Sequence, residues 1–299
     1  MMSWFHRQLA KHGRNLVIAV PMIWLIVFFL APFFVVFKIS FADIARARPP
    51  YTPLFSFEDG RLLIALSFEN YAYLWDDTLY IKAYWSSIKI AFWSTVFALL
   101  IGYPMAYVIA RASDTKRNLL LMLVILPFWT SFLLRVYAWI GFLKTQGVIN
   151  ALLLKIGIIS EPLIMLQTDF AVYVGIVYTY LPFMILPLYA NLTKLDNTLL
   201  EAAHDLGASK LMSFLTVTLP LSLPGIIAGC MLVFIPAIGE FVIPALLGGP
   251  DTLMIGKVLW TEFFNNRDWP VASAVATAML ILLVIPIMWM RRAAEEEVS

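Results

Sequence analysis

The most informative stretch of this chain is Thr198-Leu-Leu-Glu-Ala-Ala-His-Asp-Leu-Gly207, which is followed ten residues later by Val217-Thr-Leu-Pro220. Thr198 and Glu201 have the spacing of a capping box, in which each side chain satisfies a free backbone amide at the start of a helix. Gly207 permits a turn or a close approach of another backbone. The sequence therefore predicts a short helix that ends in a turn, between two long apolar segments.

The residues after the turn favour a second short helix, for which Ser209 is the expected cap. Ala202, Ala203 and Ala208 are small enough to let another backbone come close. The apolar residues of this stretch exceed what an isolated loop needs: Leu199, Leu200, Leu206, Leu211, Met212 and Phe214. The two short helices together form a compact knob, which can enter a groove on another protein. A simple helix cap would, however, account for Glu201 alone.

The composition around this knob requires a membrane. Of the 299 residues 62% are hydrophobic and only 13% are charged, and the mean hydropathy is +0.85. A bilayer core about 30 Å thick needs about 20 apolar residues per helix. Six apolar runs approach or exceed that length, near residues 16–37, 85–110, 119–143, 170–190, 219–246 and 271–290. We expect an all-α polytopic membrane protein with a single transmembrane domain, residues 1–299, and with the knob in a cytoplasmic loop, residues 191–218.

The first apolar run is too long for a signal peptide and has no obvious small-residue cleavage site, so we expect it to be retained. Six spans put both termini on one side. Lys and Arg are nearly balanced between the two sides, but they are denser on the side that holds Arg7, Lys11, Arg14, Arg111, Lys116, Arg117, Arg291 and Arg292. This density predicts that both termini lie on the cytoplasmic side of the membrane. Residues 147–159, with apolar side chains around Lys155, read as a short amphipathic helix on the outer surface.

Several classes of function are disfavoured. Cys230 is the only cysteine, and the three histidines are scattered, so neither a disulfide framework nor a metal site is expected. The net charge of +2 indicates no nucleic-acid partner. Gly256-Lys257 lacks the remaining residues of a phosphate-binding loop. We expect no cofactor, no nucleotide site and no enzymatic activity on this chain.

The full spacing of the opening stretch resembles the EAA loop of ABC importer permeases: Glu-Ala-Ala, three residues, Gly, nine residues, an aliphatic residue, one residue, then Leu-Pro. Val217 stands where isoleucine is commoner. The resemblance implies that the chain is one permease domain with the type I importer fold in a bacterial inner membrane. It also implies coupling helices that dock into a cleft on a cytoplasmic ATPase. It also implies that Glu201, Ala202, Ala203 and Gly207 transmit the ATP-driven movement.

More of the chain resembles the polyamine branch of that family, and within it the putrescine type. The matching stretches are Gly102–Tyr107, Leu126–Trp139, Phe234–Pro244 and Phe263–Pro270. The resemblance implies a second related permease as heterodimer partner, two copies of an ABC ATPase and a periplasmic polyamine-binding protein. Spermidine-type permeases share much of this pattern, so putrescine is the first expectation and spermidine the second.

A dication that crosses an apolar core needs carboxylates, carbonyl dipoles or aromatic faces along its way. Glu240 is the one acid firmly inside an expected span, on the order of 10 Å beyond the midpoint toward the outer face. Arg135 is expected at a similar height, so the two form either a structural ion pair or gate, or Glu240 serves the substrate pathway.

Aromatic candidates for the pathway are Trp129, Tyr137, Tyr178 and Tyr180, with Trp139 close by. Tyr and Trp also populate membrane interfaces and packed cores, so an aromatic belt or ordinary packing is the first alternative for each of them. Four acids on the outer side are candidates for docking the binding protein, or are simply solvated charges: Asp169, Asp251, Glu262 and Asp268.

Alternative functions remain. One is a permease for another small cationic or organic solute. A self-sufficient secondary transporter would need more intramembrane acids and an inverted repeat. A membrane-embedded enzyme would need a cluster of catalytic side chains, and a purely structural subunit would leave the loop at Glu201 unexplained.

Overall fold

The computed structural model describes residues 17–58 and 61–296. Leu16, where the first expected span begins, and the basic residues Arg7, Lys11 and Arg14 lie outside the described residues. The chain divides into two compact units. Unit 1 holds the described residues up to Asp77 together with Thr261–Leu280, and unit 2 holds Thr78–Trp260 together with the described residues from Ile281 onward. The fold is helical apart from one small hairpin, which confirms the expected all-α class.

Unit 1 begins with an apolar helix, Val17–Ile39, which contains a π-helical turn, η1 (Ile26–Leu30), followed by α2 (Ala31–Ile39). Strands β1 (Phe55–Glu58) and β2 (Arg61–Ile64) pair antiparallel, with Phe55 opposite Ile64. Helix α3 (Glu69–Asp76) follows. The amide of Asn70 on α3 donates to the carbonyl oxygens of Ser40 at 3.0 Å and Ala42 at 2.8 Å, and so fixes α3 to the end of α2. The π-helical η4 (Thr261–Asn266) and the first part of α15 (Trp269–Glu296) complete this unit.

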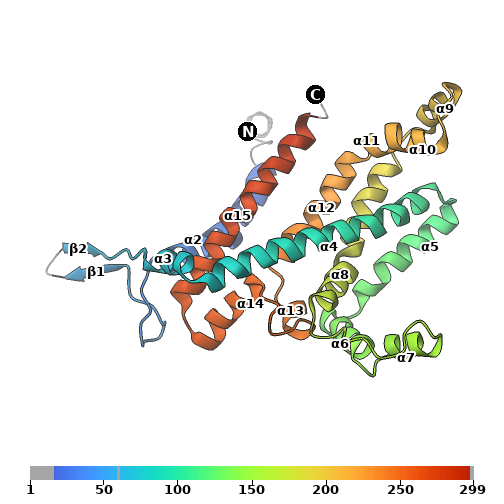
Figure 1. Ribbon diagram of the computed structural model, residues 1–299. Helices are drawn as coiled ribbons and strands as arrows, with labels where there is room; N and C mark the ends of the chain where they lie inside the picture. Colours follow the sequence, from blue (N-terminus) through green and yellow to red (C-terminus); the bar gives the residue numbers. More distant parts are fainter. Residues whose placement is uncertain (1–16, 59–60, 297–299) are drawn as a thin grey trace, which may run out of the picture. The chain divides into compact units, whose positions relative to one another are not determined.

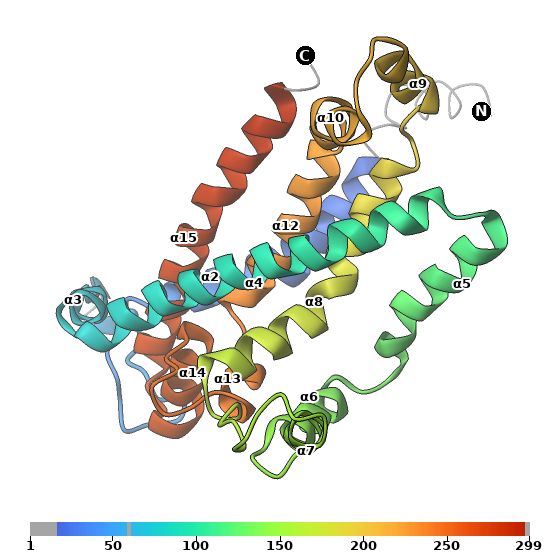
Figure 2. The same ribbon diagram turned by 45° about the vertical axis from the view of Figure 1, so that its right-hand side comes forward.

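The core of unit 2 consists of three long helices that pack side by side (Figures 1 and 2): α4 (Thr78–Arg111), α8 (Asp169–Leu192) and α12 (Leu223–Ile238). Glycines bring them close. A Cβ atom on Gly229 would lie 2.7 Å from the sulfur of Met184, and one on Gly102 would lie 2.9 Å from Cγ of the same side chain. Met184 is fully buried. Small residues at the contacts of membrane helices allow this kind of backbone approach.

Helix α5 (Asp114–Ile125) runs back from the end of α4 and continues into the 3₁₀ turn η2 (Leu126–Trp129). Helix α6 (Phe132–Leu143) starts at an angle of 94° to this segment, so the span expected near 119–143 consists of two helices joined by a sharp bend. The chain is extended at Thr130, whose hydroxyl bonds the carbonyl oxygen of Pro127 at 2.7 Å. This side-chain bond offers the backbone an alternative to a helical hydrogen bond. The short helix expected within 147–159 is present as α7 (Val148–Lys155).

The segment after α8 is built of short pieces: α9 (Asn197–Asp205), α10 (Lys210–Ser213), η3 (Phe214–Thr218) and α11 (Leu219–Leu221). The chain bends by 63° where α12 begins. Helix α12 ends at Ile238, and α13 (Val242–Leu246) and α14 (Ile255–Trp260) follow. The region expected as a span near 219–246 is therefore not one helix, because it bends before α12 and is interrupted at Gly239–Phe241.

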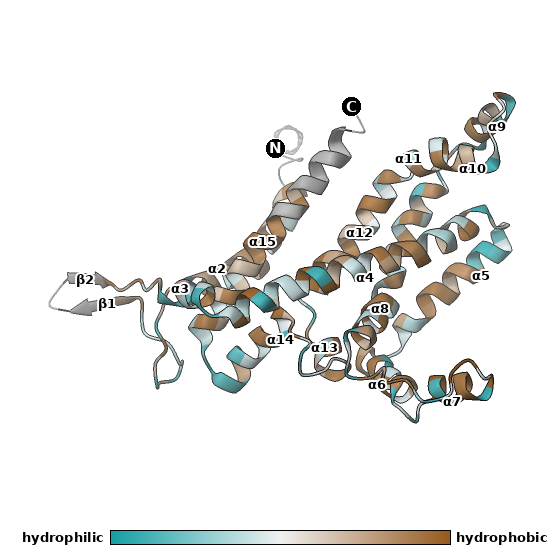
Figure 3. Cartoon of the chain, in the orientation of Figure 1, coloured by the Kyte–Doolittle hydropathy of each residue, from teal (hydrophilic) through white to brown (hydrophobic). Residues whose placement is uncertain are grey.

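Three described helices are long and apolar enough to cross a membrane: Val17–Ile39, Thr78–Arg111 and Asp169–Leu192. The count rises to five if each of the two bent pairs, Asp114–Trp129 with Phe132–Lys155 and Lys210–Leu221 with Leu223–Ile238, forms one span. The sixth expected span falls on α15, whose apolar part, Trp269–Val284, is shorter. Figure 3 shows apolar residues along α4, α8 and α12 and polar residues gathered at α9 and around the α4–α5 connection.

Candidate functional site

The first helix of the knob begins two residues earlier than expected. The carboxylate of Asp196 accepts a hydrogen bond from the backbone amide of Thr198 at 3.0 Å and caps α9. The expected Thr198–Glu201 capping box is therefore wrong, because Thr198 already lies inside the helix. The amide hydrogen bond holds the pKa of Asp196 below its ordinary value. Because Asp196 is the capping residue, Glu201 lies exposed on the helix surface and does not cap α9.

The rest of the knob matches the expected local structure. Gly207 adopts φ of 86°, the left-handed conformation that glycine tolerates best. The Ser209 hydroxyl accepts from the Met212 amide at 3.3 Å and caps α10, as expected. The turn between the two helices is closed by a 2.9 Å contact between His204 Nδ1 and the Ala208 carbonyl oxygen. The two helices therefore form one small structured unit.

Large apolar side chains are exposed on the surface of the knob, where water would normally favour polar groups. Leu206 is 89% exposed and Leu211 is 69% exposed. Glu201 and Ala202 are exposed beside them. An exposed apolar patch of this kind typically marks an interaction surface.

The root of the knob packs on α4 through contacts that sequence reasoning missed. The ring of Phe214 lies edge-on to Tyr103 at 5.7 Å and to Tyr107 at 5.9 Å between centroids. The hydroxyls of Tyr103 and Ser222 are 2.9 Å apart. The guanidinium of Arg111 stacks over Tyr107 at 4.4 Å. The signal in the sequence was the presence of Tyr103 and Tyr107 on α4 and of Phe214 shortly before the bend at Ser222. Their contacts join the knob to α4, the longest helix of the unit.

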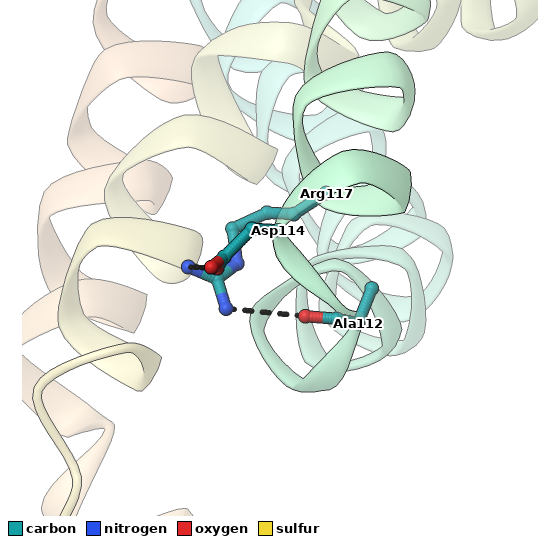
Figure 4. A network of polar contacts seen from close by, with 3 residues as sticks. All are labelled: Ala112, Asp114 and Arg117. Atoms are coloured by element: carbon teal, nitrogen blue, oxygen red, sulfur yellow. Dashed lines mark hydrogen bonds and ion pairs between the residues drawn. The ribbon is translucent and has the colours of Figure 1, made fainter.

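The short α4–α5 connection at this end is held by Arg117. Its guanidinium forms an ion pair with Asp114 at 3.1 Å and donates to the Ala112 carbonyl oxygen at 3.1 Å (Figure 4). The two contacts close the turn. Arg111 and Arg117 thus each have a local partner.

The second candidate site centres on Glu240, which is only 8% exposed. The expectation that it lies inside a helical span is wrong, since it lies in the interruption between α12 and α13. Oε2 accepts a 2.7 Å hydrogen bond from the Tyr180 hydroxyl of α8. Oε1 accepts from the backbone amides of Phe241 at 3.1 Å and Val242 at 3.0 Å, so that the side chain caps α13.

Glu240 lies on the wall of a cavity of about 440 Å³. The lining residues are Phe128, Phe132, Arg135, Thr179, Tyr180, Phe183, Pro236, Gly239, Glu240, Phe241 and Val242. Arg135 lies in the first turn of α6, with its guanidinium 5.2 Å from the centre of the Phe128 ring. Its Nε is buried without a hydrogen-bond partner among the described residues. The cavity thus combines one carboxylate, one guanidinium and several aromatic rings.

The ion pair considered for Arg135 and Glu240 is not formed in this structure. Arg117 and Asp114 form an ion pair at 3.1 Å, but Arg135 and Glu240 do not approach each other in this way. The two side chains nevertheless share the cavity. The structure therefore supports a common site for them without a direct salt bridge.

The aromatic candidates separate into two groups. Tyr180 lies in the Glu240 cavity. Trp129 is 76% exposed and does not line it, and neither does Tyr137. The ring of Tyr178 packs edge-on against Trp139 at 5.4 Å on another face of α8. Sequence reasoning missed Phe128, Phe132, Phe183 and Phe241, although the Leu126–Trp139 and Phe234–Pro244 stretches contain three of them.

Three of the four outer acids are engaged within their own units. Asp169 accepts from the Thr252 hydroxyl at 2.8 Å. Glu262 accepts from the Asn266 amide at 2.8 Å, and Asp268 accepts from the Val271 amide at 3.0 Å. Burial raises the pKa of Asp268. Among the described residues, no three of the His, Cys, Asp and Glu side chains are grouped as a metal site would require.

Comparisons with known proteins agree with this architecture. Residues 98–299 match the family described as binding-protein-dependent transport system inner membrane component. The spermidine/putrescine transport system permease protein PotB of Haemophilus influenzae is 42% identical over 274 residues, which cover 91% of each chain. The protein of the same name from Escherichia coli strain K12 is 44% identical over 220 residues, 74% of this chain and 80% of that one.

Solved structures share the fold at low sequence identity. A bacterial ABC transporter involved in the import of the acidic polysaccharide alginate contains a chain with a TM-score of 0.70 and 16% identity, and the match covers 99% of both chains. A chain of the MetNI methionine ABC transporter gives a TM-score of 0.55 at 17% identity over 73% of this chain and 96% of that one. With the bent helices, the apolar knob and the close relatives in agreement, this chain belongs to the family of inner membrane components of binding-protein-dependent transport systems, the permease subunits of ABC importers, which are not enzymes themselves.

Proposed function

We propose that this chain is the transmembrane permease subunit of an ATP-driven importer that moves polyamines from the periplasm to the cytoplasm. Its place in the permease family supports the importer. Relatives at 42% and 44% identity that are named for spermidine and putrescine support the substrate class. We place putrescine first, because Phe234–Pro244 and Phe263–Pro270 resemble the putrescine branch, and spermidine second.

The observation that carries the importer mechanism is the exposed apolar surface of the knob. Leu206 and Leu211 face outward on helices that are themselves capped and closed. Burying such side chains in a groove stabilises a complex by about 25 cal/mol per Å² of apolar area. We therefore place Glu201, Ala202, Ala203 and Gly207 against an ABC ATPase, of which two copies serve this chain and a second related permease.

The Glu240 cavity is the substrate-pathway candidate. An ammonium group in a low-dielectric core needs a carboxylate or aromatic faces, and the cavity offers Glu240 together with Tyr180 and four phenylalanines. Hydrogen bonds from two backbone amides and one hydroxyl hold the Glu240 side chain in place on the cavity wall. Arg135 carries the same charge as the substrate, so it acts as a gate that must be screened or displaced during passage.

The orientation follows from the knob. Since successive loops alternate sides, a cytoplasmic loop at residues 191–218 puts the Arg111–Arg117 connection and both termini in the cytoplasm. It puts the loops after the first and fifth spans outside. Reporter fusions to the carboxyl terminus test this proposal, and activity of a periplasm-dependent reporter at that end would contradict it.

The test of function is reconstitution. The chain is co-expressed with its partner permease and ATPase, placed in liposomes and supplied with the binding protein and labelled putrescine or spermidine. We expect uptake that requires ATP and is abolished by an inactive ATPase. Uptake driven by an ion gradient without ATP would instead favour a secondary transporter, and failure to retain an ATPase would contradict the proposal. Competition between the two labels decides between putrescine and spermidine.

A further inference from the structure

A second cavity, of about 510 Å³, lies within unit 1. Its lining residues are Ala47, Arg48, Pro49, Pro50, Phe263, Phe264, Arg267 and Trp269. It is formed by two segments far apart in the chain, the loop after the first apolar helix and the turn between η4 and α15. We refer to it as the Arg48–Arg267 recess.

Aromatic stacking fixes the frame of the recess. The rings of Phe263 and Trp269 are parallel within 5° and 5.0 Å apart between centroids. Tyr51 lies on the same indole at 6.3 Å, and the Ile44–Tyr51 bridge closes the loop that carries it. Offset stacking of this kind contributes about 0.5–1.5 kcal/mol per pair beyond burial alone. The two segments are therefore held together by packed side chains.

Two exposed arginines belong to the recess. Arg48 and Arg267 both line the recess, and neither forms an ion pair within the described part of the chain. Arg267 has φ of 56°, a left-handed conformation that is uncommon for residues other than glycine. The amide of Asp268 donates to the Glu262 carbonyl oxygen at 2.9 Å and closes this turn. Backbone outliers of this type are concentrated at functional sites.

The acids beside the recess are engaged elsewhere. Glu262 accepts a hydrogen bond from Asn266 at 2.8 Å, and Asp268 caps the start of α15 through the Val271 amide at 3.0 Å. These carboxylates, which the sequence suggested as docking contacts, thus have local structural tasks. The arginines of the recess carry the charge that is open to a partner.

The chemistry of the recess fits carboxylates on a protein surface. A guanidinium presents a planar fork that binds a carboxylate through two parallel hydrogen bonds. Arg and Trp are among the residues that contribute most to protein interfaces, especially in a pocket. The exposed ring of Phe264 adds apolar area at the rim. A single metabolite would need a more enclosed site, so the recess favours an acidic protein segment.

We infer that the Arg48–Arg267 recess docks an acidic surface segment of the extracytoplasmic polyamine-binding protein. This inference rests on the proposed function, which puts the loops after the first and fifth spans on the outer side. A protein that binds a polycation must itself carry carboxylates, and those near its binding cleft complement two arginines. Docking there joins both outer loops to the donor protein and orients its cleft over the permease.

The experiment measures the affinity of the assembled transporter, in lipid nanodiscs with its partner permease and ATPase, for the purified polyamine-binding protein. The variants are Arg48→Glu, Arg267→Glu and their combination. Arg46→Glu is the matched control, because Arg46 is exposed on the same loop but does not line the recess. Arg267→Gly suits the left-handed backbone and removes the guanidinium without strain, so it separates lost charge from misfolding.

We expect the double variant to bind at least about tenfold more weakly and Arg46→Glu to bind within about twofold of the wild type. Raising the salt from about 0.1 M to about 1 M should weaken the wild type more than the double variant, because screening acts on the charges that remain. Equal binding by the wild type and the double variant would overturn the docking inference while leaving the proposed function intact. A wild-type complex that binds no polyamine-binding protein at all would instead overturn both.

Discussion

The hydroxyl of Tyr180 donates a 2.7 Å hydrogen bond to Oε2 of Glu240 and so ties α8 to the interruption between α12 and α13. The other carboxylate oxygen is held by the amides at the start of α13. The side chain of Glu240 therefore connects three elements, namely the long helix α8, the end of α12 and the start of α13. Movement of any of these elements must change the surroundings of the carboxylate, which places the substrate-pathway candidate at a joint of the fold.

Replacing Tyr180 by Phe removes the donor to Oε2 while the ring stays. Hydrogen bonds to charged groups contribute about 1.5–3 kcal/mol, so the assembled transporter should unfold at a lower temperature and take up polyamine more slowly. Thermal unfolding and ATP-dependent uptake measure the two effects. Tyr178→Phe is the control on the same helix, since Tyr178 does not line the Glu240 cavity. Equal effects of both substitutions would show that the hydrogen bond to Glu240 does not account for the loss of stability and uptake.

Replacing Glu240 by Gln removes the charge but keeps an oxygen that can accept from the Phe241 and Val242 amides. We expect uptake to fall by at least about tenfold, since a cation loses its counter-charge in a site of low dielectric. Assembly and basal ATPase activity should remain close to the wild type. Glu161→Gln, at an exposed position, is the control. Undiminished uptake by the Glu240 variant would remove this carboxylate from the pathway.

Hydropathy could predict where the chain is apolar but not where its helices break. Membrane helices tolerate proline and glycine, so the turn at Thr130 and the interruption at Gly239–Phe241 leave the apolar pattern unchanged. Both breaks depend on local hydrogen bonds, from the Thr130 hydroxyl to Pro127 and from the backbone amides to Glu240. These bonds compete with the helix in a way that a sliding average of hydropathy does not register.

The candidate site was predictable in part. The resemblance around Phe234–Pro244 pointed to Glu240, and the height argument placed Arg135 near it. The partner Tyr180 is 60 positions away in sequence, so only the packing of α8 on α12 reveals the bond. The knob was predicted as two short helices, and the structure confirms both. The first helix starts at Asn197 because the carboxylate of Asp196 caps it.

The position of the α9 cap gives a discriminating pair of substitutions. Asp196→Ala removes the observed acceptor for the Thr198 amide, so α9 should fray and uptake should fall. Thr198→Ala should leave both unchanged, whereas the capping box expected from the sequence would require the opposite order. Amide hydrogen exchange of α9, measured with ATP-dependent uptake, separates the two outcomes.

The same cap makes the stability of α9 depend on pH in a defined direction. The pKa of Asp196 is lower in the folded protein than its ordinary value, so the folded state favours the charged form. Its contribution is fully present above the unfolded pKa, about 3.9 for an aspartate, and is lost as the pH falls through the lower folded value. The protection of α9 amides, which is the exchange rate corrected for the intrinsic pH dependence of amide exchange, should therefore be flat near neutral pH and fall in strong acid only when Asp196 is present. A fall of equal size in Asp196→Ala would contradict this assignment.

Leu206 tests whether the knob binds an ATPase. It is 89% exposed, so Leu206→Glu should leave the fold of the chain intact. A charge in an apolar groove must be desolvated without a partner, so the variant should lose most of the co-purifying ATPase together with ATP-dependent uptake. Ile158→Glu is the matched control, because this exposed aliphatic residue follows α7 and lies outside the knob. Retention of the ATPase by Leu206→Glu, or an equal loss of the ATPase from the Ile158 variant, would contradict a role of the knob's apolar surface in energy coupling. Since docking and catalysis reside on different chains, loss of the ATPase with an unchanged melting temperature of the permease pair is the result that assigns this surface to coupling.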